Sequence, residues 1–299
     1  MTANAWTRRE ERGSEPLMRL MLWIARAAGR APARMLLAPI ALYFWLFAPG
    51  ERHASRAYLQ RVLAPGRIGP LHTLRHIHTF ASVLLDRLFL LDRRIDRFRI
   101  TVHGENHLLQ AHRSGGGAFL FGAHFGSFEA VRTLGVQLGG CRVTLAMYER
   151  NARKIGALLR AIDPQLANDI VALGRIDSML TLQSRLQRGD FVGFLADRTI
   201  GDDATLSLPF LGVPARFPLG AFRMAAVLRR PVLWMAGIYR GGNRYEIHVE
   251  PLADFSQVHR RDRDEAIASA VAAYAERLQH HCRSAPYNWF NFYDFWDGC

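Results

Sequence analysis

The sequence predicts an α/β fold in which a largely parallel sheet is flanked by helices, with a membrane-associated helical segment at the N-terminus. From residue 98 onward, short apolar runs alternate with helix-like stretches of about 10 to 15 residues, which is the pattern of βαβ units. Glycines bound several of the runs, as Gly117 and Gly122 bound the run 118–121. With 299 residues, of which 49% are hydrophobic, the chain can bury one sizeable core.

The expected elements follow this alternation along the chain. Strands are predicted at 98–102, 118–121, 142–147, 169–173, 191–195, 231–239 and 245–249. Helices are predicted between them at 106–113, 127–138, 152–162, 177–188 and 219–229, with a final helix at 264–283. Two further helices, 51–63 and 71–91, precede the first strand. No repeat and no low-complexity linker interrupts 51–299, so we expect one domain there.

The first 50 residues are predicted to form a separate basic segment. Seven arginines stand among the first 34 residues, and an apolar run follows at 35–48. These 14 residues fall short of the ~20 needed to span a bilayer, and Pro39 interrupts them. Together with the helical spacing of 17–30, the run predicts a helical hairpin in the cytoplasmic leaflet, its arginines on anionic headgroups. The cluster Tyr43, Phe44 and Trp45 favours this interface over the alternative, a core helix pair of a soluble protein.

His124 lies in the turn between the strand 118–121 and a helix for which Ser127 is the expected N-cap. Such turns often carry catalytic groups, because the strand end fixes the residue while the loop leaves it accessible. Glu129 follows in the first helical turn, where a negative charge is favoured. A neutral imidazole can take a proton from a hydroxyl, and a carboxylate on its other nitrogen fixes the tautomer and stabilises the imidazolium. We therefore predict that His124 is a general base oriented by Glu129.

Chance offers a competing explanation for this histidine-to-acid spacing. Twelve histidines and 26 acidic residues produce about one such match by accident. The chain holds two, and the second, from His259 to Asp264, lies in a polar run with no preceding strand. We interpret the second match as the accidental one. The alternative for the first is a histidine packed at a strand end with an unrelated surface glutamate.

The net charge of +13 predicts attraction to anionic partners, with acidic protein, anionic lipid and nucleic acid as the candidates. Nucleic acid is the weakest of the three, because neither a zinc-finger spacing nor a basic-region heptad accompanies the arginines. We therefore expect no nucleic-acid partner.

No metal or cofactor is expected. The three cysteines, Cys141, Cys282 and Cys299, include no Cys-x-x-Cys pair. The helix 71–91 carries three histidines without a complete set of metal ligands. The chain contains neither a Gly-x4-Gly-Lys-Ser/Thr loop nor a Rossmann glycine fingerprint. The glycines around His124 have the spacing of a nucleophile elbow, but its central residue is histidine rather than serine, so no covalent acyl-enzyme is expected.

Three further sequence blocks follow the His124 turn in a recognisable order. They are Met-Tyr-Glu-Arg-Asn at 147–151, Gly-Phe-Leu-Ala-Asp-Arg at 193–198, and the block 209–220, which begins Pro-Phe-Leu-Gly-Val-Pro-Ala-Arg. In this order the chain resembles the late acyltransferases of lipid A biosynthesis and, more broadly, the lysophospholipid acyltransferase superfamily. The resemblance covers roughly residues 17–296. It implies a glycerolipid acyltransferase-like fold with 51–299 as the acyltransferase domain.

The resemblance implies acyl transfer from an acidic acyl carrier protein, or from coenzyme A, to a hydroxyl of a lipid or glycolipid acceptor. It places the reaction at the cytoplasmic face of the bacterial inner membrane, with anionic lipids as partners and no cofactor beyond the acyl donor. It makes His124 the general base and Glu129 its partner. The residues implied to contact substrate are Gly126, Ser127, Arg150, Asn151, Asp197, Arg198, Gly212 and Pro214. Because a thioester is already activated, a base, an oxyanion stabiliser and an apolar slot suffice.

The C-terminal segment 287–296 contains seven aromatic residues and one charge, Asp294. Lipid A acyltransferases typically end instead in a tryptophan-and-basic segment. The aromatic ending resembles acyltransferases of aryl-polyene or xanthomonadin-type pigment pathways, which implies a pigment-type acceptor. Lipid A itself is one alternative, and a catalytically inactive membrane-associated scaffold of the same fold is another. We expect the segment to pack back near the acyl slot or to lie at the membrane surface, with plain core packing as the alternative.

Overall fold

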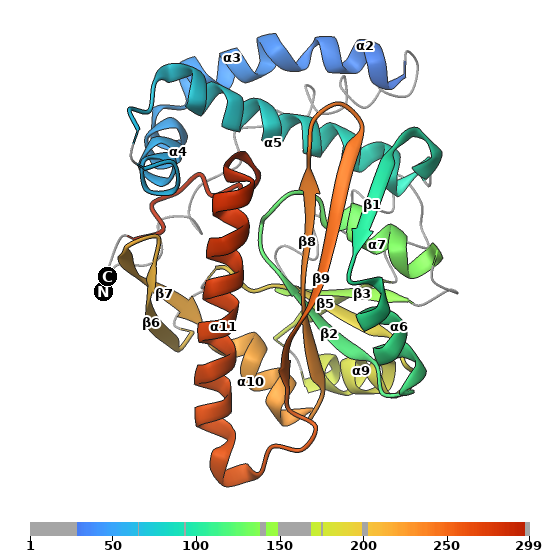
Figure 1. Ribbon diagram of the computed structural model, residues 1–299. Coiled ribbons are helices and arrows are strands. Elements are labelled where there is room, and N and C mark those ends of the chain that lie inside the picture. Colours follow the sequence, from blue (N-terminus) through green and yellow to red (C-terminus); the bar gives the residue numbers. More distant parts are fainter. Residues whose placement is uncertain are drawn as a thin grey trace.

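The computed structural model describes residues 29–64, 66–92, 94–137, 142–148, 169–174, 176–198 and 203–296. Its centre is a seven-stranded sheet with the strand order β1-β9-β8-β2-β5-β3-β4. Neighbouring strands are parallel except β8 and β9, which form an antiparallel pair. Helices cover both faces of the sheet (Figure 1). The predicted α/β fold with a largely parallel sheet is confirmed.

The elements have the following bounds. The sheet contains β1 (Arg99–His103), β2 (Ala118–Gly122), β3 (Val143–Tyr148), β4 (Ile170–Leu173), β5 (Phe191–Leu195), β8 (Pro231–Tyr239) and β9 (Arg244–Asp254). The helices before it are α2 (Arg30–Met35), α3 (Leu37–Phe47), α4 (Pro49–Val62) and α5 (Pro70–Leu91). Those that follow β1 are α6 (Glu105–Arg113), α7 (Phe128–Gln137), α9 (Ile176–Gln187), α10 (Gly220–Val227) and α11 (Arg263–Ser284).

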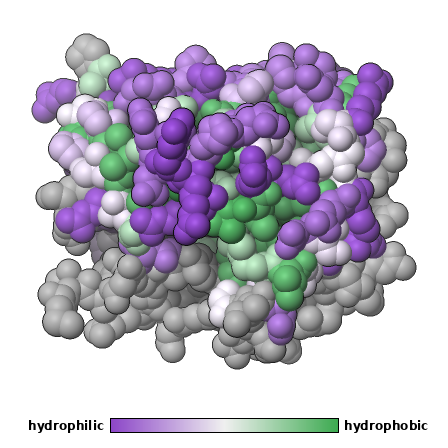
Figure 2. All heavy atoms as spheres, turned by 90° about the horizontal axis from the view of Figure 1, so that it is seen from below, coloured by the Kyte–Doolittle hydropathy of each residue, from purple (hydrophilic) through white to green (hydrophobic). Residues whose placement is uncertain are grey.

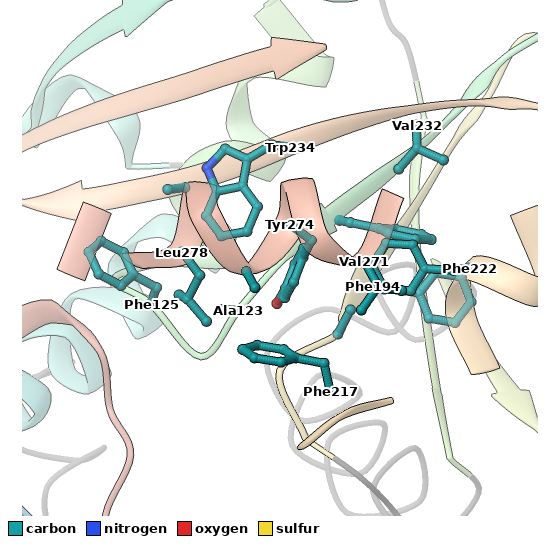
Figure 3. Packing of buried hydrophobic residues seen from close by; sticks show 14 of the residues in the cluster. Ala123, Phe125, Phe194, Phe217, Phe222, Val232, Trp234, Val271, Tyr274 and Leu278 are labelled. Carbon is teal, nitrogen blue, oxygen red and sulfur yellow. The ribbon is translucent and has the colours of Figure 1, made fainter. Parts of the chain in front are cut away.

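Strand β2 is buried on both faces, because successive side chains of a strand point to opposite sides. Phe119 and Phe121 lie in a core cluster with residues of α9, α10 and α11. The alternate residues of β2 lie in a second cluster with residues of α5, α6 and α7. Figure 3 shows part of the first cluster, where Tyr274 of α11 lies beside Trp234 of β8, their ring centroids 5.0 Å apart. The strand that leads to His124 is therefore held between two layers of helices.

The observed strands and helices agree closely with the predicted ones. All seven predicted strands are present, and their bounds differ by at most one residue except at β9, which continues to Asp254. The helix expected at 152–162 lies outside the described residues. The sequence pattern predicts no strand between residues 195 and 231, and this is wrong. In that region β6 (Thr205–Phe210) and β7 (Val213–Pro218) form a separate antiparallel hairpin. The three prolines of this hairpin argue against strands, because proline is disfavoured inside them.

Helices α2 and α3 pack along α5 (Figure 1). Ala33 and Leu37 are buried in the second core cluster, and Arg30 forms a two-point ion pair of 2.7 and 2.9 Å with buried Asp86 of α5. In the described part of the chain, no single helix is long and apolar enough to cross a bilayer. A pair bent by 97°, Arg30–Phe47 with Pro49–Val62, passes that test by length and composition only. Residues 1–28 of the predicted membrane segment lie outside the described residues, and its attachment to a membrane stays a prediction.

Candidate active site

His124 and Asp197 occupy corresponding positions beyond the ends of two neighbouring parallel strands. The register of β2 with β5 pairs Gly122 with Leu195. The N–H of Ala196 extends this ladder by donating to the carbonyl of Gly122 over 2.9 Å. The residues two positions beyond Gly122 and Leu195 are therefore brought together at the carboxyl edge of the sheet. These residues are His124 and Asp197.

Asp197 accepts three hydrogen bonds although its side chain is only 1% exposed. Oδ1 accepts from Nδ1 of His124 over 2.8 Å. Oδ2 accepts from the backbone N–H of His124 over 3.1 Å and from Nε1 of Trp289 over 3.0 Å. The carboxylate that orients His124 is therefore Asp197. The prediction that Glu129 orients His124 is therefore corrected, and contact of Asp197 with substrate stays a prediction.

Glu129 pairs instead with Arg87 of α5. Nε of Arg87 lies 2.6 Å from Oε1 of Glu129, and both side chains are largely buried. The five-residue spacing from His124 places Glu129 on the first turn of α7, whereas the strand register places Asp197 beside the imidazole. The pair of Arg87 and Glu129 joins α5 to α7 next to the His124 loop. Arg87 could not be predicted as a site residue, because it is one of several polar residues on the amphipathic helix α5.

The surroundings favour a neutral imidazole beside an ionised carboxylate. Burial lowers the pKa of His124 below its ordinary value of 6.5, and the charge of Arg198 lowers it further against the opposing effect of Asp197. Burial alone would raise the pKa of Asp197, but the hydrogen bond from His124, the charge that His124 carries at acid pH and the charge of Arg198 hold that pKa well below its usual range. An ionised carboxylate only accepts, so Nδ1 carries the proton and Nε2 carries the lone pair. With 34% of its side chain exposed, His124 remains accessible to a substrate.

The backbone of the His124 turn is fixed by its neighbours. Gly126 has a φ of 59°, and a Cβ there would lie 1.9 Å from the carbonyl oxygen of Gly237 on β8, so only glycine fits. The N–H of Ser127 donates to that same carbonyl over 2.7 Å. The hydroxyl of Ser127 accepts from the N–H of Ala130 over 3.2 Å, which confirms the predicted N-cap. These contacts give Gly126 and Ser127 structural roles, and their contact with substrate stays a prediction.

The C-terminal segment 287–296 packs directly on this turn. The N–H of Phe290 donates to the carbonyl of His124, and the N–H of Gly126 donates to the carbonyl of Asn288, each over 2.8 Å. Trp289 is fully buried and reaches Asp197 with its indole N–H. The segment packs back on the domain with Trp289, Phe295 and Trp296 in the first core cluster, as the core-packing alternative predicts, and a place beside the acyl slot stays a prediction. Trp289 is a site residue that the sequence analysis missed, and the aromatic composition of the segment was its only signal.

His76 of α5 holds the C-terminal segment from the other side. Its Nε2 lies 2.8 Å from the carbonyl oxygen of Trp289, and its Nδ1 lies 2.8 Å from the hydroxyl of Ser55. Burial lowers the pKa of His76 to about 4, so the ring is neutral at physiological pH. Both ring nitrogens of His76 take part in these hydrogen bonds, which gives this histidine of α5 a structural role.

Arg198 also contacts the C-terminal segment. Its Nη2 donates to the carbonyl of Phe290 over 3.0 Å, and its guanidinium lies 5.3 Å from the ring centroid of Tyr293. Its charge acts on His124, as the lowered pKa of that residue reflects. Direct contact of Arg198 with substrate stays a prediction.

The other residues predicted to contact substrate belong to the β6–β7 hairpin or lie outside the described residues. Gly212 lies in the turn of the β6–β7 hairpin and Pro214 lies on β7. The ring of Phe210, from the same hairpin, packs against Trp289 with a centroid separation of 5.4 Å. The hairpin thus packs against Trp289, which donates a hydrogen bond to Asp197. Arg150 and Asn151 lie outside the described residues.

One group of described side chains has the geometry of metal ligands, namely His103, Glu246 and His248. It lies on β1 and β9 and includes none of the predicted site residues.

The fold and the site define an α/β protein with a histidine–aspartate pair at the carboxyl edge of a parallel sheet, the place where α/β enzymes bind their ligands. Residues 79–297 match the family model of the bacterial lipid A biosynthesis acyltransferases. The match covers most of the chain and includes the segments that carry His124, Asp197 and Trp289. The chain belongs to this family, which confirms the predicted resemblance at the family level. No curated protein matches it.

Proposed function

We propose that the protein transfers a fatty acyl chain from the thioester of an acyl carrier protein, or of coenzyme A, to a hydroxyl of a lipid A precursor or a related glycolipid. The hydrogen bond between His124 and Asp197 carries this proposal, because it supplies an oriented, neutral base within a chain whose family transfers acyl groups. The net charge of +13 suits an acidic carrier protein as the donor.

In the proposed reaction, Nε2 of His124 takes the proton of the acceptor hydroxyl as its oxygen attacks the thioester carbonyl. The tetrahedral intermediate then collapses, the carbon–sulfur bond breaks, and the imidazolium returns the proton to the leaving thiolate. Asp197 stabilises the imidazolium between these steps, since it is ionised and bonded to Nδ1. The products are an ester and a free thiol, so no other reactant is required.

Two arginines, Arg198 and Arg87, place positive charge near His124. Arg198 and Arg87 both lower the pKa of His124 through their charges. We assign this charge to stabilising the oxyanion of the intermediate and the phosphates of the substrates. Glu129 then acts through Arg87, whose guanidinium it holds at 2.6 Å, and is a positioning residue.

An apolar strip on α5 supports an amphiphilic substrate. Phe80 and Leu84 are exposed large hydrophobic residues, and Arg87 lies on the same side of the helix at i, i+4 and i, i+3 spacing. Phe80 packs against Phe290 and Phe292 of the C-terminal segment, with ring centroids 5.1 and 5.4 Å apart. An acyl chain lying along this strip would have its polar end near Arg87 and His124.

The end of the molecule formed by α3 and α5 is the proposed membrane contact. Leu42, Tyr43, Leu46 and Phe47 of α3 are exposed, as is Leu71 of α5. Figure 2 views the opposite end, where hydrophilic side chains dominate the described surface around an apolar centre. Replacing Leu46 and Phe47 together by glutamate should reduce sedimentation with anionic lipid vesicles, whereas unchanged sedimentation would contradict this part of the proposal.

The acceptor is proposed to be a lipid A precursor because of the family, and a pigment-type glycolipid is the second candidate because of the aromatic ending. Expression in a strain that lacks a late lipid A acyltransferase, followed by mass spectrometry of lipid A, distinguishes the two. A restored acyl chain supports lipid A, and unchanged lipid A favours the pigment-type acceptor.

His124→Ala tests the mechanism. Loss of a general base typically costs ~10²–10⁴ in rate, so acyl transfer should fall by that factor while the protein remains folded. The control is His259→Ala, which alters an exposed histidine of the second, accidental match and should be nearly silent. Transfer by His124→Ala within a few-fold of wild type would refute the mechanism and leave the inactive scaffold as the better account.

A further inference from the structure

A second polar cluster lies on the edge of the central sheet. β1 is an edge strand and pairs in parallel with β9, so that His103 lies opposite His248. Glu246 precedes His248 by two positions on β9 and therefore projects from the same face. The intervening Ile247 is buried in the core cluster on the other face. The three polar side chains thus share the face of the sheet that α11 covers farther along, at Trp234 of β8.

The geometry of the three side chains is that of a ligand set. Their donor atoms all lie within 4.8 Å of one another. The imidazoles of His103 and His248 stack with ring centroids 4.6 Å apart and an interplanar angle of 26°. Nε2 of His248 lies 3.8 Å from Oε2 of Glu246, too far for a hydrogen bond, and is buried without a hydrogen-bond partner. A buried polar atom of this kind is rare in folded proteins, and a bound ion would satisfy it.

The chemistry of the donors selects the kind of ion. Two imidazoles and a carboxylate match the ligands that Zn²⁺ uses, whereas Ca²⁺ and Mg²⁺ require oxygen donors.

Two neighbouring charged residues, Arg240 and Glu250, are not part of this set of metal ligands. Arg240 contacts Oε2 of Glu246 through Nε at 2.8 Å and Nη2 at 2.7 Å, and its charge opposes a cation. Oε1 of Glu246 lies outside these contacts. Glu250, the next acidic residue on this face of β9, is engaged by Arg277 at 2.7 Å and by His281 at 3.1 Å.

We propose that His103, Glu246 and His248 bind a divalent transition-metal ion of the zinc type and thereby link the edge strand β1 to β9. Three protein ligands leave the fourth position of a tetrahedral site for water. The site is independent of the proposed acyl transfer, because none of its residues touches His124 or Asp197.

Equilibrium dialysis of full-length, tag-free, chelator-treated protein against Zn²⁺, followed by metal analysis, tests this site. We expect one Zn²⁺ per chain and a raised midpoint of thermal unfolding when Zn²⁺ is present. His103→Ala and His248→Ala should each weaken the affinity by about tenfold or more, whereas His259→Ala should not. Because His103 is exposed on an edge strand, its replacement leaves the core intact, and circular dichroism checks the fold.

Arg240→Gln provides a test in the opposite direction, since it removes the competing charge and should tighten Zn²⁺ binding. Absence of Zn²⁺ binding by the wild-type protein would overturn the proposal. Equal affinity in the wild type and in both histidine variants would overturn it as well, and so would weaker binding by Arg240→Gln.

Discussion

Replacing Asp197 by asparagine is the sharpest test of the site, because the hydrogen bonds of this residue dictate how asparagine must lie. On the Oδ2 side, both partners are donors, the backbone N–H of His124 and the indole N–H of Trp289. The asparagine carbonyl oxygen must occupy that side, which turns the amide NH₂ toward Nδ1 of His124. Nδ1 must then accept, so the proton moves to Nε2 and the nitrogen that should act as base no longer carries a lone pair.

The expected magnitude follows from that change of tautomer. Asp197→Asn should remove most of the general-base contribution, so kcat should fall by ~10²–10⁴, equivalent to about 3 to 5 kcal/mol of transition-state stabilisation. KM should change little, because Asp197 is buried and the variant retains its shape. The assay follows a labelled acyl chain from acyl carrier protein to a lipid A precursor, with release of the free thiol as a second readout.

Glu129→Gln is the matched control, since it also neutralises a carboxylate in the same region. Glu129 contacts Arg87 rather than His124, so this variant should retain much of the chemical rate and act mainly through KM for the charged substrate. If Glu129→Gln abolished kcat while Asp197→Asn stayed within a few-fold of wild type, the assignment of Asp197 as the orienting carboxylate would be wrong.

Three further outcomes are expected. Because the pKa of His124 lies below 6.5 and the base must be neutral, kcat should rise with pH through an inflection below pH 6.5; an inflection above that value in the pH profile would contradict the electrostatic account. Trp289→Phe should lower the free energy of unfolding in denaturant by about 1.5 to 3 kcal/mol more than Trp234→Phe does. The reason is that the indole N–H of Trp289 donates to a carboxylate, whereas the equally buried Nε1 of Trp234 has no hydrogen-bond partner. Truncation after Ser284 should depress thioester hydrolysis and acyl transfer together, and a selective loss of acceptor use would indicate that the C-terminal segment binds the acceptor instead of building the site.

The sequence predicts the strands of the sheet because each strand is an apolar run that can be recognised from its own residues. The run 118–121 is buried on both faces and is continuously apolar, as central parallel strands are. The β6–β7 hairpin escaped prediction for the opposite reason. Pro209, Pro214 and Pro218 remove backbone donors, and a two-stranded ribbon outside the main sheet tolerates their absence.

The partner of His124 could not be predicted from spacing, because it depends on strand order. β5 follows β2 only after two intervening strands in the chain, yet it lies directly beside β2 in the sheet. Periodicity identifies both strands without indicating that they are neighbours. The residues two positions beyond the two strand ends become a pair only when that order is known, whereas spacing alone favours the nearer acidic residue, Glu129. The same reasoning applies to Trp289, which reaches Asp197 only through the packing of the C-terminal segment.

The ionised state of Asp197 depends on that packing. A buried carboxylate is costly unless hydrogen bonds compensate for lost hydration, and one of its three donors comes from Trp289. Trp289 in turn is held through its carbonyl by His76 and through its ring by Phe210. The orientation of His124 is thus linked to α5, to the β6–β7 hairpin and to the last residues of the domain. Because these contacts meet at one carboxylate, any change that displaces the C-terminal segment should perturb the base before it unfolds the sheet.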